Sequence, residues 1–274
     1  MSSLAKNIKV RKSQDRGHAN HGWLNTYHTF SFAMYYNAHF AGWSSLRVLN
    51  EDRVTGGEGF GAHPHSNYEI FSYVISGSLK HQDTLDNEEE IKRGGVQFTS
   101  AGSGIMHSEY NHSPTKPVHF LQVWFKPDQQ DLKPSYQTVH FTDDEKQGRL
   151  CLIVSSKYHG DSNKKDDNDD TEKKAPVVVN QNAQVFASLL ARDEAVSYKF
   201  GPERCGYLHV CDTGGRLRLI DDRNDEELVL EAGDGAYVKA GTRLHLVGGN
   251  DEDDKRVEFL LFDLVKEEKD RAWW

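Results

Sequence analysis

The stretch GFGAHPHSNYEIFSYVISG, residues 59–77, joins a glycine-rich segment, two closely spaced histidines and an apolar run. The run YEIFSYVI is rich in aromatic and β-branched residues and is soon followed by glycine, a combination typical of β-strands. His63 and His65 stand two positions apart, and residues two apart lie on the same face of a strand. The stretch therefore predicts β-structure in which both imidazoles point the same way.

Runs of the same kind recur along the chain and make β-structure the dominant prediction. They are VHFLQVWF (118–125), RLCLIVSS (149–156), APVVV (175–179), GAYVKA (235–240) and VEFLLFDLV (257–265). The chain has 23 glycines, whereas helical apolar spacing is scarce, and only AQVFASLLARDEAV (183–196) is compatible with a helix. Many short strands with glycine-rich turns predict an all-β fold, built as a sandwich or a barrel.

The composition restricts the classes of function. The 274 residues carry a net charge of -9 without a basic stripe, so nucleic acid is not an expected partner. No apolar stretch is long enough to cross a bilayer, and the first residues lack the apolar centre of a secretory signal. The three cysteines form no CxxC pair, which favours a reducing compartment. We expect a cytoplasmic location, with the nucleus as the alternative, and no membrane partner.

An acidic segment separates two related halves of the chain. The segment GDSNKKDDNDDTEKK (160–174) contains no large apolar side chain, and we expect a mobile insertion there. GVQFTSAG is echoed by GAYVKAG, and VHFLQVWF by VEFLLFDL, both at an offset of 139 residues, which indicates a duplicated β-domain. We predict an N-terminal domain over 1–140, a connecting segment over 141–175 and a C-terminal domain over 176–274.

A second segment, GIMHSEYNH at 104–112, supplies another pair of potential metal ligands. His107 and Glu109 are again two apart and share a strand face. Three imidazoles and one carboxylate form a ligand set that first-row transition metals accept, with coordination positions left open. Glu69 follows His63 and His65 by an even number of positions, so it would share their strand face. Spacing alone therefore leaves open whether Glu69 or Glu109 is the carboxylate ligand.

Other residues near these pairs are candidates for a pocket. Phe60, Met106 and Trp124 lie close to the motifs in the sequence, where they would line a cavity for an aromatic molecule or belong to the core. The remaining candidates are histidines expected as structural or pocket-edge groups, namely His18, His21 and His28.

The two histidine segments together resemble the metal motifs of the cupins, and specifically those of the pirin family. The similarity is carried by HPHSNYEIFSYVISG and GIMHSEYN, and it extends to RGHANHGWLNTYHTFSF, GEGFGAHPH, KHQDTL and QFTSAGSGIMHSEYN. It runs from about residue 8 to 140, is looser from 176 to 265, and has no counterpart for the acidic insertion. The resemblance implies a bicupin, an all-β chain of two β-barrel (jelly-roll) domains with few short helices.

The same resemblance implies the ligands and the reaction. It assigns one divalent metal to His63, His65, His107 and Glu109 of the N-terminal domain, with iron first and nickel, copper, manganese, cobalt or zinc as alternatives. The bacterial branch of the family implies a metal-dependent dioxygenase that opens the heterocyclic ring of flavonols such as quercetin and releases carbon monoxide. The partners would be a flavonol-like aromatic substrate and dioxygen. Glu109, and after it Glu69, would take the proton of the substrate hydroxyl.

The sequence leaves two other functions open. The animal pirins imply a metal- and redox-sensitive co-regulator of transcription factors, which would have a protein partner. A metal-bound cupin could also act on a different small molecule.

The C-terminal half lacks equivalent ligands. An offset of 139 carries the four ligand positions onto Pro202, Arg204, Leu246 and Gly248, and none of these suits the metal. A shift of register by one brings only His245 into place. We therefore predict a C-terminal domain without a metal site.

Overall fold

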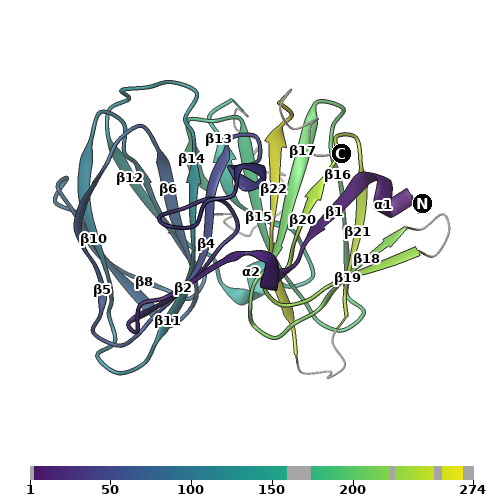
Figure 1. Cartoon of the computed structure of the whole chain (residues 1–274), viewed down its shortest axis with the longest axis horizontal. Coiled ribbons are helices and arrows are strands. Elements are labelled where there is room, and N and C mark those ends of the chain that lie inside the picture. Colours follow the sequence, from purple (N-terminus) through teal and green to yellow (C-terminus); the bar gives the residue numbers. More distant parts are fainter. Residues whose placement is uncertain (1–2, 159–173, 222–225, 250–254, 268–274) are drawn as a thin grey trace. The chain divides into compact units, whose positions relative to one another are not determined.

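The computed structural model describes residues 3–158, 174–221, 226–249 and 255–267, and these consist mainly of strands (Figure 1). The helical elements among them are short: α1 (Ser3–Asn7), α2 (Asp143–Lys146) and two 3-10 turns, Ser13–Asp15 and Ala38–Phe40. The all-β prediction with few short helices is confirmed. Within these ranges no helix is long and apolar enough to span a membrane. The predicted acidic insertion lies outside the described residues, apart from Lys174.

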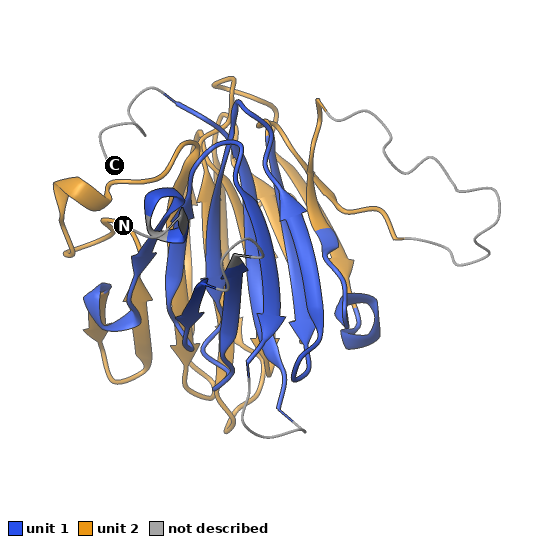
Figure 2. Ribbon diagram, turned by 90° about the vertical axis from the view of Figure 1, so that its right-hand side faces the viewer, with its two compact units in different colours: residues 1–16, 142–152, 183–274 blue, residues 17–141, 153–182 orange. Residues whose placement is uncertain are grey.

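The chain folds into two compact units, and each unit is built from segments that are separate in the sequence (Figure 2). Unit 1 comprises residues 1–16, 142–152 and 183–274, and unit 2 comprises residues 17–141 and 153–182. The first 16 residues thus belong to the same compact unit as the C-terminal half. The sequence domains that divide at 140 and 175 stay a prediction.

Unit 2 contains two antiparallel sheets. The larger has the order β12-β9-β6-β11-β4-β3-β2, with bounds β2 (Gly17–Asn20), β3 (Leu24–His28), β4 (Leu46–Val54), β6 (Glu69–Ser76), β9 (Gly95–Ser100), β11 (Val118–Phe125) and β12 (Ser135–His140). The smaller has the order β5-β10-β7-β8, with bounds β5 (Gly59–His65), β7 (Ser78–Asp83), β8 (Glu88–Lys92) and β10 (Ile105–Asn111). The apolar runs YEIFSYVI and VHFLQVWF form the central neighbours β6 and β11, as their buried patterns require.

Unit 1 also contains two antiparallel groups of strands. One has the order β1-β20-β17-β22-β15, with bounds β1 (Ile8–Arg11), β15 (Ala183–Leu190), β17 (Arg204–Val210), β20 (Gly235–Val238) and β22 (Val257–Val265). The other has the order β16-β21-β18-β19, with bounds β16 (Ala195–Lys199), β18 (Leu217–Asp221), β19 (Glu226–Leu230) and β21 (Arg243–Gly248). Strands β13 (Cys151–Ser156) and β14 (Val177–Val179) pair in parallel through residues 154–156 and 177–179, which belong to unit 2.

The two units repeat one strand order. β9, β6, β11 and β4 are consecutive neighbours in unit 2, as β20, β17, β22 and β15 are in unit 1. The smaller sheets match in the same way, β5-β10-β7-β8 with β16-β21-β18-β19. The echoed sequences fall at matching places, since β9 corresponds to β20 and β11 to β22. The topology supports the duplicated β-domain inferred from the sequence.

The one stretch compatible with a helix, residues 183–196, forms strand β15 and the start of β16. Val185 lies opposite Phe262 and Phe186 opposite Leu261 of β22, so the segment is a sheet neighbour of a buried strand. Pairing with that strand outweighs a weak helical spacing in which β-branched and aromatic residues are poor helix formers.

An apolar core fills only part of the space between the two sheets of unit 2. Its members come from both sheets: Leu24, Val54, Val74, Leu79, Ile91, Val118 and Phe120. Elsewhere the inward-facing residues are polar and buried, among them Ser72, His107 and Glu109. Buried polar groups need partners, so this part of unit 2 is where a functional site is expected.

Candidate metal centre

Three histidines meet where strands β5 and β10 pair. The strands are antiparallel, with His107 opposite His63 and Ile105 opposite His65. One ligand nitrogen from each histidine lies within 4.8 Å of the others, and the Nε2 atoms of His63 and His107 are 3.2 Å apart. A single strand pair thus brings together the three histidines that the sequence singled out. Within the described ranges, they form the cluster suited to a metal ion.

A β-bulge shapes strand β5 at this cluster. His107 lies opposite His63, but Glu109 lies opposite Phe60, so β5 contains one extra residue in this interval. Phe60 and His63 line the same cavity although an odd number of positions separates them. Gly59 permits the close pairing, because a Cβ at this position would lie 2.4 Å from the carbonyl oxygen of Glu109.

The imidazoles are suited to act as neutral donors. The Nδ1–H of His63 donates to the Gly61 carbonyl at 2.7 Å, which leaves a lone pair on Nε2. Burial lowers the pKa of His107 to about 3 and that of His65 to about 4, and neighbouring histidines act in the same direction. Because neutral imidazole is the form that binds metals, these side chains fit a divalent transition metal near neutral pH.

Glu109 is fully buried and shares the inward face of β10 with His107. Its Oε1 accepts a hydrogen bond from the Ser72 hydroxyl at 2.8 Å, and its Oε2 accepts one from the Gln122 amide at 2.9 Å. The Trp124 indole N–H donates to the other end of Gln122 at 3.2 Å and so fixes the amide orientation. A carboxylate offers about four acceptor positions, so two remain for a metal or a proton. The Glu109 carboxylate is not among the three clustered donors, and its ligation stays a prediction.

Glu69 is bound to a different part of unit 2. Both of its carboxylate oxygens accept hydrogen bonds from Asn180, one from the backbone N–H at 2.6 Å and one from the side-chain amide at 2.7 Å. Glu69 does not line the cavity to which His63 and His65 belong. These contacts indicate that Glu69 anchors the segment around Asn180. Its catalytic role stays a prediction that none of these contacts supports.

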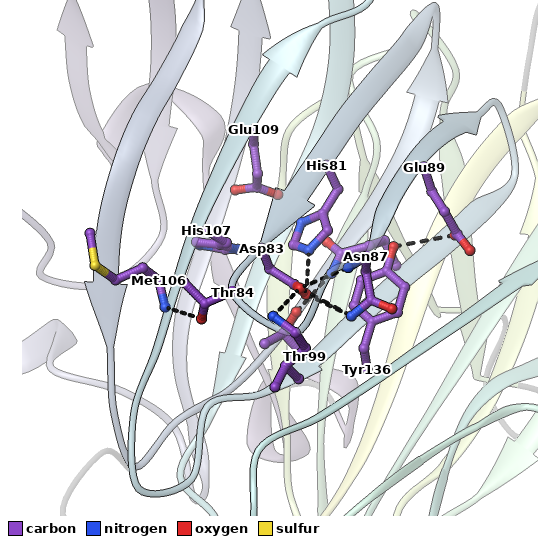
Figure 3. A network of polar contacts seen from close by, with 12 residues as sticks. His81, Asp83, Thr84, Asn87, Glu89, Thr99, Met106, His107, Glu109 and Tyr136 are labelled. Atoms are coloured by element: carbon purple, nitrogen blue, oxygen red, sulfur yellow. Dashed lines mark hydrogen bonds and ion pairs between the residues drawn. The ribbon is translucent and has the colours of Figure 1, made fainter.

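A buried histidine–aspartate pair adjoins the cluster (Figure 3). His81 Nε2–H donates to Asp83 at 3.0 Å, and the His81 ring lies edge-on to His107 with centroids 5.3 Å apart. Burial acts to raise the pKa of Asp83, but hydrogen bonds from His81 and Asn87 outweigh it and hold that pKa below its ordinary value. The His81 ring, held by Asp83, thus packs against the His107 ring. The sequence reasoning missed it, although KHQDTL carries a histidine and an aspartate at strand spacing.

A cavity of about 730 Å³ opens beside the histidines, and His63 and His65 form part of its wall. This volume lies within the range of roughly 300–1,000 Å³ that is usual for small-molecule sites. The wall has five aromatic members, which are Trp23, Phe32, Tyr35, Phe60 and Trp124. It also has a strip of polar members, here called the polar strip, which comprises Thr26, His28, Asn50, Asp52 and Gln122.

The cavity wall contains most of the residues that the sequence singled out as pocket candidates. Phe60 and Trp124 line it, as do the three pocket-edge histidines His18, His21 and His28. Met106 does not line it, because its side chain lies on the outward face of β10 and is 44% exposed.

In unit 1 the strands that match β5 and β10 are β16 and β21. His245 is the third residue of β21, as His107 is of β10, and it lies opposite Ser197. The His245 Nδ1 and the Ser197 Oγ are 3.1 Å apart. A serine thus stands where unit 2 has His63, and the absence of a metal site from the C-terminal domain stays a prediction.

Comparisons with known proteins agree with this geometry. Residues 9–125 match the family model described as pirin, and residues 169–264 match the quercetinase C-terminal cupin domain. A curated relative, quercetin 2,3-dioxygenase from Escherichia coli K12, is 39% identical over 257 residues, which cover 94% of this chain and 98% of the relative. The chain belongs to the pirin family.

Two further relatives extend the comparison. The crystal structure of the bacterial pirin YhhW from Escherichia coli in complex with nickel(II) matches with a TM-score of 0.78 at 34% identity, covering 95% of this chain and 100% of that one. A pirin-like protein from Caulobacter vibrioides is 37% identical over 199 residues, or 72% of this chain and 80% of the relative. The bicupin fold predicted for this pirin is confirmed. The family and the histidine cluster together imply a divalent metal centre.

Acid is expected to destabilise the metal-free form of this pirin. In the folded state His65 and His107 have pKa values of about 4 and about 3, whereas in the unfolded chain they take up protons near the ordinary histidine value of 6.5. Between about pH 6.5 and pH 4 the unfolded state therefore binds more protons than the folded state does. The free energy of unfolding falls as the pH drops from 7 toward 4. Thermal unfolding at pH 7 and at about pH 4.5 measures the fall. A His65→Gln/His107→Gln variant should show a smaller fall, and an equal one would contradict the assignment.

Removing the Ser72 hydroxyl is expected to weaken metal binding. Ser72→Ala leaves Glu109 without one of its two orienting hydrogen bonds, and loss of such a partner costs about 10–100-fold in metal affinity. Competition with a chromogenic chelator gives the affinity. Thr99→Val is the matched control, because it removes a buried hydroxyl that bonds to Gln97 instead. Equal affinities for Ser72→Ala and wild type would argue against Glu109 as a ligand.

Proposed function

We propose that this pirin is a metal-dependent dioxygenase that opens the heterocyclic ring of a flavonol and releases carbon monoxide. The observation that carries the proposal is the histidine cluster in the wall of an aromatic cavity of about 730 Å³. The relatives named quercetin 2,3-dioxygenase support it. In the balanced reaction both atoms of dioxygen enter an ester product, and the ring carbon that bears the reacting hydroxyl leaves as carbon monoxide.

The roles of the polar residues follow from their positions. A divalent metal at His63, His65 and His107 would supply Lewis acidity toward an ionised hydroxyl oxygen. Glu109 takes the hydroxyl proton, since its carboxylate is buried beside the cluster and keeps acceptor positions open. Gln122 holds that carboxylate in place while the proton moves.

The aromatic wall orients a planar substrate and keeps water away from the reacting ring. Trp23 packs edge-on to Phe60 with centroids 5.2 Å apart, and Phe32 packs edge-on to Trp124 at 5.5 Å. Trp124 in turn packs edge-on to His65 at 4.8 Å. A flavonol that lies among these rings would sit next to His65, and holding it there would favour reaction at the metal by proximity.

Iron remains our first choice of metal, with nickel, copper, manganese, cobalt and zinc as alternatives, because three imidazoles and a carboxylate accept all of them. The relative YhhW was crystallised with nickel(II). The cytoplasmic location also stays a prediction, and no observation here favours the nucleus. A co-regulator with a protein partner and a cupin for another small molecule remain the alternatives, but the cavity favours a small-molecule function.

The test combines metal analysis with turnover. The purified protein should contain about one metal ion per chain and should consume quercetin and dioxygen in equal amounts, with one carbon monoxide trapped per flavonol. Quercetin absorbance followed with and without dioxygen provides the rate. A fully metal-loaded protein that leaves quercetin unchanged in air would overturn the proposed function.

A further inference from the structure

We infer that Asp52 is a specificity residue that binds a second hydroxyl group of the substrate, separate from the hydroxyl directed to the metal. The inference rests on the proposed function and deepens it, because a residue with this role would favour polyhydroxylated flavonols over those with a single hydroxyl. It concerns a residue that neither sequence motif contains.

The first observation is the place of Asp52 in the polar strip. Asp52 lies on β4, opposite Thr26 of β3, and two positions further along the strands Asn50 lies opposite His28. Gln122 of β11 lies opposite Asn50 on the other side. Residues at this spacing share one face of the sheet, and all five line the cavity. The strip thus presents hydrogen-bonding groups toward a ligand that the aromatic side chains would flank.

The second observation is that Asp52 has an unused acceptor. The side chains of His28 and Asn50 are bonded to each other at 2.9 Å, and Gln122 is bonded to Glu109. In contrast, the Oδ1 atom of Asp52 is buried and has no hydrogen-bond partner within the described residues. A buried polar atom without a partner is unfavourable, so a ligand group that bonds to this oxygen gains affinity.

Charge and burial define the chemistry of that ligand group. Burial raises the pKa of Asp52 to about 7. Contact with the Thr26 hydroxyl opposes this rise, and the charges of Glu109 and Glu51 add to it. Asp52 is therefore partly protonated near neutral pH. A hydroxyl donates to the ionised form and accepts from the protonated form, so it pairs with both. An anionic ligand group would be repelled by Glu109 and by ionised Asp52. A phenolic hydroxyl is the group that fits.

The test measures binding without turnover. Metal-loaded protein is titrated by calorimetry under nitrogen with quercetin, which has five hydroxyls, and with 3-hydroxyflavone, which has only the reacting one. Asp52→Ala should bind quercetin about 10-fold more weakly, the size of effect expected for one lost hydrogen bond to a charged or partly charged group. It should bind 3-hydroxyflavone within about twofold of wild type. Asp52→Asn, which keeps an acceptor and a donor, should recover most of the quercetin affinity.

Glu51→Gln is the matched control. Glu51 neighbours Asp52 on the same strand, but it is bonded to His119 at 2.9 Å and does not line the cavity. Loss of its charge shifts only the balance between the two forms of Asp52, and a hydroxyl pairs with both, so Glu51→Gln should bind both flavonols within about twofold of wild type. Metal content and thermal unfolding show that each variant is folded and loaded.

The outcomes separate the inference from the proposed function. Equal losses for both flavonols in Asp52→Ala, or no loss for either, would overturn the role of Asp52 while leaving the dioxygenase intact. If metal-loaded wild type binds neither flavonol, the proposed function fails, and the inference fails with it.

Discussion

Replacing His107 with alanine is expected to abolish metal binding and, with it, flavonol turnover. The three clustered histidines contribute one nitrogen each within 4.8 Å, so His107→Ala removes one of three imidazole donors and should lower the metal affinity below what survives dialysis. Mass spectrometry should show a fall from about one ion per chain to roughly none. Quercetin absorbance in air should then stay constant.

Stability distinguishes a lost ligand from a lost fold. A metal that binds only the folded state stabilises it by about 2.7 kcal/mol when present at 100 times its Kd. Added metal should therefore raise the Tm of wild type and leave that of His107→Ala unchanged. His112→Ala is the matched control, because His112 is a half-exposed histidine just beyond the same strand. If His107→Ala kept one ion per chain, the three-histidine site would be refuted.

Replacing Glu109 with glutamine is expected to lower kcat/KM for quercetin by about 100- to 10,000-fold, the usual contribution of a general base. The amide keeps the size of the side chain, yet it can neither take a proton nor ligate as an anion. Steady-state rates in metal-saturated buffer separate this loss from weaker metal binding.

Glu69→Gln provides the contrast. Because both carboxylate oxygens of Glu69 are bonded to Asn180, the variant should keep its metal and its rate and lose only stability. A reduced Tm with normal turnover is the expected result. Should Glu69→Gln lose activity while Glu109→Gln keeps it, the two carboxylates would have to exchange roles.

The sequence allowed the strands and the three histidines to be predicted, because both depend on local patterns. Period-two spacing places His63 beside His65, and an apolar run such as VHFLQVWF forms a buried strand wherever it finds neighbours. The choice between Glu69 and Glu109 could not come from spacing, since both share a parity with the histidines. It depends on which strand pairs with β5, and that pairing is a long-range property of the sheet.

For the same reason, the polar groups around the site could not be predicted from local sequence patterns. Ser72, Gln122 and Asp52 come from three different strands of the larger sheet, and only the register of those strands brings them to the cavity side. The bulge in β5 adds a second obstacle. It breaks strict alternation between Phe60 and His63, so parity alone would have assigned them to opposite faces.

The contacts of Trp124 give the protein an intrinsic optical signal. The indole lies edge-on to His65 of the histidine cluster and donates its N–H to the Gln122 amide that is bonded to Glu109. We therefore expect its emission to change when a metal ion fills the histidine cluster and when an aromatic molecule stacks beside it. Tryptophan fluorescence can follow loading of the centre and filling of the cavity in the same cuvette, with no label and without waiting for a reaction.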